Sequence, residues 1–271
     1  MKRVLLATPM KGTCDTHYLR SLIATLRADI PDTRIDLTIC DSGCVNFARN
    51  EIAFEAEQGG YDRLVQIDDD MAYKPEHLIR LLSHDVDMVA GYYCKRKPGK
   101  PHWLFVPKEG AVQREDGLLE SLRVATGFQN VRVSCLTAMR KKFPEREFLC
   151  QDVEGGPVST KMEWYPMGVT GPRTADEKLQ KIRKELDDWS HPSAEALGDR
   201  IQRIIDEEHP PGTLRGEDYY FCDMFRAAGF TIYTDMLMPA IPHMGLVGYP
   251  ITPDMVGFGP GIEQRIVAEA K

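Results

Sequence analysis

The sequence predicts an α/β protein with a mixed, mainly parallel central sheet and helices on both of its faces. In residues 1–95, short apolar runs of strand length alternate with stretches in which apolar residues recur every three or four positions. The chain has 271 residues, of which 42% are hydrophobic and 28% charged. That length and composition suit one large globular domain, or one domain with a sizeable insertion.

The expected strands and helices of residues 1–95 follow one another in alternation. In the first helix, Leu19, Leu22 and Leu26 recur at helical spacing and share one face. Pro75 suits the first turn of the third helix. The expected strands are 4–7, 35–39, 64–67 and 86–92, and the expected helices are 16–26, 45–57 and 75–82.

After residue 95 the pattern becomes less regular. Proline, glycine and charged residues are frequent between 96 and 130, and a further strand is expected at Val131–Met139. Residues 173–209 resemble an inserted helical hairpin whose first helix begins with a capping box of Thr174 and Glu177. The remaining expected elements are short strands at 103–106 and 119–124, a short helix or turn at 140–143, a helix at 216–229 and a strand at 231–233.

Charge and apolar content limit the possible functions. The net charge of −7 argues against a general polyanion binder but permits a local basic groove. Two basic clusters are either solvated loop and helix ends or such a groove: Lys95, Arg96, Lys97 and Lys100, and Arg140, Lys141, Lys142 and Arg146. No apolar window is long enough for a membrane helix, and the N-terminal apolar run is too short for a signal peptide. Together with seven scattered cysteines, this predicts a cytoplasmic protein with reduced thiols.

Three consecutive aspartates follow the expected strand at 64–67. Asp68, Asp69 and Asp70 would project from the carboxyl edge of the sheet, where open α/β sheets bind ligands. Carboxylates so close together repel one another unless a cation compensates their charge. The triplet therefore indicates a divalent metal site, and the alternative is a solvated turn, in which aspartate is common.

A second group of polar residues lies in the C-terminal part. Glu217 and Asp218 begin a helix, where they either favour the helix dipole or provide a general base beside a cleft. His243 lies between Pro242 and Gly245, and is either structural or a metal ligand.

Taken in order along the chain, these segments resemble the glycosyltransferases of the GT-A fold, in particular the large family-two-like group, which includes enzymes of the bacteriophage type. The resemblance rests on the following segments: Ala7-Thr8-Pro9, Phe47-Ala48-Arg49-Asn50, Ile67-Asp68-Asp69-Asp70, Val89 to Arg96, Gly216-Glu217-Asp218, and His243 with Gly245.

The resemblance implies a role for each residue of the two polar groups. Asp70, the last carboxylate of the Asp-X-Asp motif, and His243 would bind Mn²⁺ or Mg²⁺, and Asp68 would assist them or contact the sugar or ribose. Asp218 would deprotonate the acceptor hydroxyl, and Glu217 would orient the site. The donor, most simply a UDP-sugar, would be held by Thr8, Pro9, Asp41, Arg49, Asp68 and Asp69.

The implied activity is that of a metal-dependent, hexosyltransferase-like enzyme. One base opposite the leaving group predicts inversion at the anomeric carbon. Residues 1–271 would form a single GT-A domain, with a nucleotide-binding half at 1–95 and an acceptor-binding half at 96–271. The acceptor would be a glycan or another hydroxyl compound, or else a 5-hydroxymethylpyrimidine base of phage DNA, in which case the enzyme would act in the host cytoplasm.

Two features depart from the family pattern. Related enzymes carry a glycine-rich turn where this chain reads Ser134-Cys135-Leu136-Thr137, and Ala125-Thr126-Gly127-Phe128 resembles that turn at a different spacing. The hairpin at 173–209 has no counterpart in the family pattern. A sugar-1-phosphate nucleotidyltransferase and a non-catalytic sugar-nucleotide-binding module remain alternatives, although the first strand is followed by only one glycine, at Gly12, where a nucleotidyltransferase needs several.

Overall fold

The computed structural model describes residues 1–96, 102–151, 156, 158–170, 182–188, 193–206 and 213–244. Its contacts divide the chain into two units, Met1–Pro166 with Glu217–Lys271, and Met167–Gly216. All the candidate site residues belong to the first unit.

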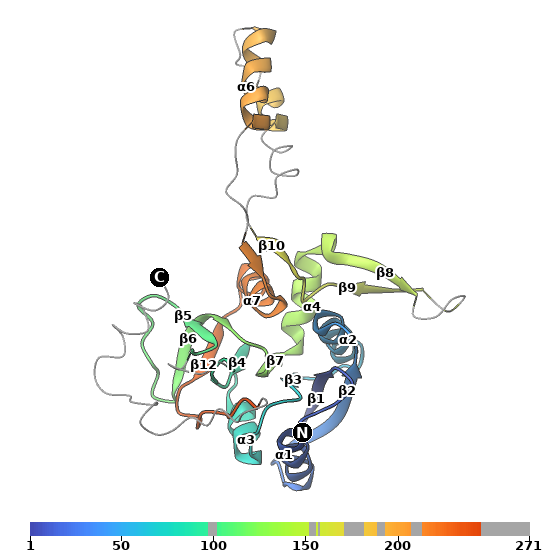
Figure 1. Ribbon diagram of the computed structural model, residues 1–271, viewed down its shortest axis with the longest axis vertical. Helices are drawn as coiled ribbons and strands as arrows, with labels where there is room; N and C mark the ends of the chain where they lie inside the picture. The colour runs from blue at the N-terminus through green and yellow to red at the C-terminus, as the bar shows by residue number, and fades with distance from the viewer. Residues whose placement is uncertain are drawn as a thin grey trace. The chain divides into compact units, whose positions relative to one another are not determined.

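The first unit is built on an eight-stranded sheet (Figure 1). Its strands are β1 (Lys2–Met10), β2 (Thr33–Asp41), β3 (Arg63–Ile67), β4 (Met88–Ala90), β5 (Phe105–Pro107), β6 (Leu118–Val124), β7 (Phe128–Arg132) and β12 (Ile232–Asp235). The strand order is β2-β1-β3-β7-β4-β12-β6-β5. β7 is antiparallel to both β3 and β4, and β6 is antiparallel to both β12 and β5, while the other pairs are parallel. All strands except β6 and β7 therefore point the same way, which confirms the mixed, mainly parallel sheet.

Helices cover both faces of this sheet. They are α1 (Thr16–Arg27), α2 (Val45–Gln58), α3 (Pro75–Ser83), α4 (Val133–Lys142) and α7 (Glu217–Ala227), with a 3₁₀ turn, η1, at Pro144–Arg146. One core cluster joins the sheet to α2, α4 and α7, and the other joins it to α1 and α3. β1 shows why both form: Val4 and Leu6 enter one cluster, and Leu5 and Ala7 enter the other, because successive side chains point to opposite faces.

Two further substructures are described separately. A two-stranded ribbon consists of β8 (Glu147–Gln151) and β9 (Val158–Met162). The second unit contains β10 (Gly168–Thr170), β11 (Thr213–Arg215), a helix at 182–187 and α6 (Ala194–Asp206). Arg200 Nε lies 2.8 Å from a carboxylate oxygen of Glu185, which links the two helices in the region of the predicted hairpin. Thr174 and Glu177 lie outside the described residues.

The predicted strand at Val131–Met139 is wrong. β7 ends at Arg132, and α4 begins at Val133. Val133, Leu136 and Met139 are buried at helical spacing, and basic residues in the last turn, such as Arg140, complement the helix dipole. The expected strand at 86–92 is shorter than predicted and covers only Met88–Ala90.

Among the described residues, we find no helix that combines the length and the apolar character needed to span a membrane.

Candidate active site

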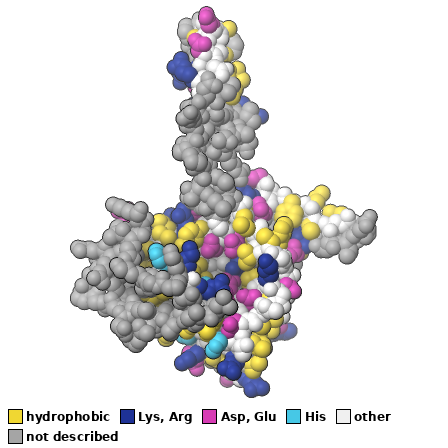
Figure 2. Space-filling model, viewed as in Figure 1, with side chains coloured by type: hydrophobic (Ala, Val, Ile, Leu, Met, Phe, Trp, Pro, Cys, Tyr) yellow, Lys and Arg dark blue, Asp and Glu magenta, His cyan; other side chains and the backbone are white. Residues whose placement is uncertain are grey.

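The acidic triplet lies at the carboxyl edge of the sheet. β1, β2 and β3 are parallel, so their last residues and the loops that follow meet there. The backbone carbonyl of Asp69 accepts a 2.8 Å hydrogen bond from the N–H of Asp15, and Asp41 Oδ1 accepts one of 2.9 Å from the N–H of Gly12. These contacts tie the loop after β1 to the ends of β2 and β3. Charged side chains of both signs gather near the middle of the face in Figure 2, between β3 and α7.

His243 lies directly beside the triplet. The N–H of Met244 donates to the carbonyl of Asp70 at 2.8 Å, and the N–H of Ala72 donates to the carbonyl of Pro242 at 3.0 Å. These bonds fix residues 242–244 alongside residues 70–72. As a result, His243 Nε2 lies 3.4 Å from Asp70 Oδ1. The structure thus brings together two residues that are far apart in the sequence.

The chemistry of this pair fits a metal ligand set. His243 Nδ1 lies 3.0 Å from the carbonyl oxygen of Cys94, which can only accept, so Nδ1 carries a proton, and in the neutral imidazole Nε2 then has a free lone pair. Asp70 Oδ1 is buried and makes no hydrogen bond. Two adjacent ligands of Mn²⁺ or Mg²⁺, each about 2.1 Å from the ion, lie about 3 Å apart, close to the observed separation.

The described residues contain no group of three or more His, Cys, Asp and Glu side chains arranged to hold a metal. The remaining ligands would therefore come from the substrate and from water. The second carboxylate oxygen of Asp70, Oδ2, pairs with the Arg96 guanidinium at 2.7 Å. A cation on Oδ1 and this guanidinium on Oδ2 use different oxygens of the same carboxylate.

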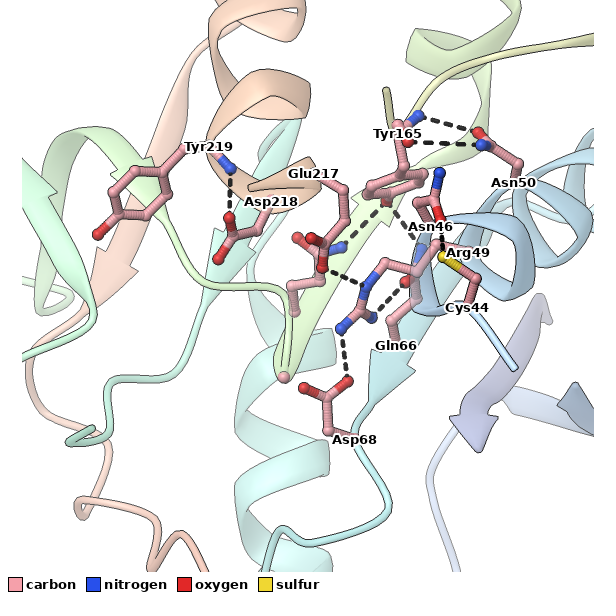
Figure 3. A network of polar contacts seen from close by, with 12 residues as sticks. Cys44, Asn46, Arg49, Asn50, Gln66, Asp68, Tyr165, Glu217, Asp218 and Tyr219 are labelled. Carbon is pink, nitrogen blue, oxygen red and sulfur yellow. Dashed lines mark hydrogen bonds and ion pairs between the residues drawn. The ribbon is translucent and has the colours of Figure 1, made fainter. Parts of the chain in front are cut away.

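Arg49 connects the triplet to the start of α7 (Figure 3). Its buried guanidinium donates to Asp68 Oδ1 at 2.7 Å, to Gln66 Oε1 at 3.0 Å and to Glu217 Oε1 at 3.4 Å. Burial disfavours the charge, but the attraction of Asp68 and Glu217 outweighs it and raises the pKa of Arg49 above its usual value. All these contacts are within the protein, and the predicted contact of Arg49 with a nucleotide stays a prediction.

Buried polar side chains around Tyr165 hold in place the strands and helices that carry Arg49, Asp68 and Glu217. The side-chain amides of Gln66 and Gln129 both donate to the Tyr165 hydroxyl, at 2.8 and 3.1 Å. The backbone N–H of Tyr165 donates to Asn50 Oδ1 at 2.9 Å, and its ring stacks on Phe221 with centroids 4.3 Å apart. These contacts hold β3, β7, α2 and α7 in fixed relation (Figure 3).

Glu217 and Asp218, adjacent in the first turn of α7, differ in environment. Glu217 pairs with Arg49. Asp218 accepts a 2.7 Å hydrogen bond from the backbone N–H of Tyr219. Burial, followed by repulsion from Glu217, raises the pKa of Asp218 to about 6. A carboxylate with such a pKa is well matched to general base catalysis near neutral pH.

Gly127 occupies the turn that precedes β7, beside Asp68. The N–H of Asp68 donates to the Gly127 carbonyl at 3.0 Å, and the N–H of Gly127 donates to the Tyr93 hydroxyl at 2.7 Å. A Cβ at position 127 would clash with the Tyr93 hydroxyl and lie 2.9 Å from Asp68 Oδ2. The glycine turn at 125–128 therefore borders the site. Residues 134–137 lie in α4.

The remaining predicted donor-binding residues have varied surroundings. Thr8 and Pro9 are buried, and the Thr8 hydroxyl shares a hydrogen bond with the Tyr18 hydroxyl. Asp41 is exposed. Burial, and then repulsion from Asp70 and Asp68, raises the pKa of Asp69. Their contacts with a donor remain predictions.

In the two basic clusters the described arginines form ion pairs, whereas Lys95, Lys141 and Lys142 are exposed. Arg96 pairs with Asp70, and Lys97 and Lys100 lie outside the described part of the chain. In the second cluster, Arg140 pairs with Glu57 and Glu147, and Arg146 pairs with Glu163. These arginines serve internal ion pairs, so the geometry does not specifically favour a DNA acceptor.

Sequence reasoning missed several residues of this region. Gln66 interrupts the apolar run Leu64–Ile67, and Gln129 and Asn130 lie between Phe128 and Val131, a pattern that could have indicated a buried polar network. Tyr93, whose ring lies edge-on to His243 at 5.2 Å, carries no such signal because aromatic residues are common at strand ends. Tyr165 likewise lies in an irregular segment without periodicity.

Several solved structures resemble this chain distantly. No protein-family model matches the chain, and no curated protein matches it by sequence. The solved structure of A197 from STIV matches 90% of this chain and 86% of its own, with 14% identity and a TM-score of 0.41. Mannose-1-phosphate geranyltransferase from Thermus thermophilus matches 54% of this chain, with 12% identity and a TM-score of 0.37, and TarS 1–349 from S. aureus matches 51%, with 14% identity and a TM-score of 0.32. This chain covers 62% and 48% of those two chains, and at these scores the likenesses carry no weight for function.

Proposed function

We propose that this protein is a metal-dependent glycosyltransferase that moves a sugar from a nucleotide-diphosphate sugar to an acceptor hydroxyl. The observation that carries the proposal is the pair formed by Asp70 Oδ1 and His243 Nε2, 3.4 Å apart at the carboxyl edge of the sheet. The buried Asp70 oxygen has no hydrogen bond, and the tautomer of His243 leaves its Nε2 free to bind a cation.

Different residues of the chain would bind the metal ion, act as the base and position the other carboxylates. Asp70 and His243 would hold Mn²⁺ or Mg²⁺, which when bound stabilises the charge of a departing diphosphate. Asp218, with a pKa of about 6, would be ionised at neutral pH and able to take the proton of the acceptor hydroxyl. Arg49 would keep Asp68 and Glu217 in place, so that neither competes with Asp218 for the acceptor's proton.

The finer parts of the proposal follow from the same residues. A single base that acts opposite the leaving group favours direct displacement and inversion of the anomeric carbon. A UDP-sugar is the donor that we propose, with a glycan or another hydroxyl compound as acceptor. NMR of the product would show the opposite anomeric configuration from the donor, and retention would reject the single displacement.

The test measures nucleotide release from a panel of nucleotide sugars, with Mn²⁺ or with EDTA, for the wild-type chain and three variants. We expect Mn²⁺-dependent release that is lost in Asp70→Asn and His243→Gln and retained in Asp116→Asn, a control carboxylate that pairs with exposed Arg114. Calorimetry should show that the two site variants lose Mn²⁺ binding. Absence of nucleotide-sugar binding, or full activity of Asp70→Asn, would reject the proposal. Pyrophosphate formation from a nucleoside triphosphate and a sugar 1-phosphate would instead support a nucleotidyltransferase.

A further inference from the structure

The outer edge of the sheet at β2 is long, regular and open. β2 is last in the strand order, and its nine residues pair with β1 without a bulge. No other strand of the described chain pairs with its outer side (Figure 1). Sheets commonly protect their edges with short strands, bulges, prolines or charged side chains, lysine above all. The opposite edge does so, because β5 has three residues, ends at Pro107 and carries a register shift there. β2 is long, has no bulge and contains no proline or lysine, and its charged residues are Arg34, Asp36 and Asp41.

The two faces of β2 pack against different helices and are not equally buried. On one face Cys40 packs against the cluster that contains α2. On the other face Ile35 packs against the cluster that contains α1 and α3. Leu37 and Ile39 share this second face, because side chains alternate along a strand, and they remain 39% and 45% exposed.

The flank of α1 next to this face is also apolar. Ser21 Oγ accepts a hydrogen bond from the N–H of Tyr73, which shows that Ser21 faces the centre of the sheet. At about 100° per residue, Leu19, Ile23 and Leu26 lie on the opposite flank of the helix, toward β2. They are 44%, 43% and 52% exposed. We call these three residues together with Leu37 and Ile39 the β2 edge patch.

From these features we propose that the chain forms a two-fold symmetric dimer in which β2 pairs antiparallel with β2 of a second copy. Overlap of the whole strand, Thr33–Asp41, places the two-fold axis at Leu37. Leu37 then faces Leu37 of the other copy, and Ile35 faces Ile39. Because directly opposite residues point to the same side of a sheet, the apolar flanks of both α1 helices line the same side of the joined strands.

The charges along β2 suit a second copy in this register. Arg34 faces Cys40, Asp36 faces Thr38, and Asp41 faces Thr33, so that no charged residue lies directly opposite another. The two Asp36 side chains are diagonal neighbours. Each is already paired within its own chain, with Arg34 at 3.3 Å and Arg3 at 3.6 Å, which reduces their repulsion.

The test is sedimentation velocity of the full chain from low to high micromolar concentration, with variants at the axis. The wild-type chain should sediment as a dimer, and Leu37→Lys and Leu37→Glu should each sediment as monomers, because like charges then face each other across the axis. An equal mixture of the two variants should restore the dimer. Val112→Lys, at a 74% exposed apolar position outside the patch, is the matched control and should remain a dimer.

Several outcomes would overturn the dimer. These are a monomeric wild-type chain throughout the range, dimers of both single variants, and a mixture that stays monomeric although circular dichroism shows each variant folded. Dimers of the mixture alone would establish the register, since other registers do not bring position 37 opposite itself. None of these results depends on the sugar-transfer activity, so failure of one proposal leaves the other standing.

Discussion

Replacing Arg49 by methionine tests whether the buried guanidinium holds the site together. The Arg49 side chain is 3% exposed, and its carboxylate partners Asp68 and Glu217 are 26% and 14% exposed. Removing one member of a buried ion pair costs about 3–5 kcal/mol, because the partner remains as an uncompensated charge. Water reaches part of both carboxylates here, so we expect the lower end, about 3 kcal/mol, including the lost hydrogen bond to Gln66.

The assay is urea unfolding at neutral pH, followed by circular dichroism, together with thermal unfolding. For a chain of this size, about 3 kcal/mol corresponds to a decrease in Tm of roughly 6–12 °C. The matched control is Arg123→Met, which removes a guanidinium that makes two hydrogen bonds to Asp223, at 2.9 and 3.1 Å, where both side chains are about one-quarter exposed. Fully exposed pairs contribute about 0.2–1 kcal/mol, and because water reaches both side chains of this pair, the control should lose less stability than Arg49→Met, whose guanidinium is buried. Equal small losses in both variants would refute the reasoning, since the Arg49 network would then be no stronger than a surface ion pair.

Three further results are expected. The transfer rate should fall as the pH decreases through about 6, because Asp218 becomes protonated there and can no longer act as a base. Glu217→Gln removes a neighbouring negative charge, so it should lower the pKa of Asp218 and move this fall to lower pH. A pH–rate profile that the Glu217→Gln variant leaves unmoved would contradict this reasoning. The pKa of Asp218 in the folded protein lies above the usual value, so its protonated form stabilises the fold, and this contribution is lost as the pH rises through about 6. Asp218→Asn removes the buried charge, and should therefore raise the free energy of unfolding above pH 6 by on the order of 1 kcal/mol. Urea unfolding measures this difference. Gly127→Ala should lower both Tm and Mn²⁺-dependent donor binding, because the added methyl group meets the Tyr93 hydroxyl and Asp68. Gly198→Ala, in the interior of α6 with open space around it, should leave donor binding unchanged and should not lower Tm, because alanine favours a helix more than glycine does.

The N-terminal half of the fold could be predicted because its local signals agree with its tertiary structure. α1, α2 and α3 begin and end within one or two residues of the expected bounds. In α2 and α3 the apolar periodicity is also the periodicity of burial, whereas in α1 Leu22 is buried but Leu19 and Leu26 are exposed. The segment after residue 130 failed for the opposite reason. Val131, Val133 and Thr137 favour a strand by their branched side chains, whereas packing against α2 makes the chain helical from Val133.

The residue types of the candidate site are visible in the sequence, but its internal pairings are not. Asp68, Asp70, Asp218 and His243 carry chemistry that is visible in the sequence. The pairing of His243 with Asp70 depends on backbone hydrogen bonds between residues 70–72 and 242–244, which have no local signal. Similarly, nothing near Arg49 shows that its partners are Gln66, Asp68 and Glu217.

The reversed direction of β7 explains why a turn before a strand borders the site. Parallel strands such as β1 and β3 bring the residues that follow them to the carboxyl edge of the sheet. Candidate site residues are therefore usually sought in the sequence directly after each predicted strand. β7 runs antiparallel between β3 and β4, with Phe128 opposite Ile67, so its beginning lies where β3 ends. Gly127 must then adjoin Asp68, and a side chain there would displace the carboxylate. The same reasoning applies to β6, the other reversed strand: Gly117, which precedes it, lies beside the end of β12, where its carbonyl accepts a hydrogen bond from the N–H of Met236. In a mixed sheet of this kind, candidate site residues should therefore be sought before each reversed strand as well as after each parallel one.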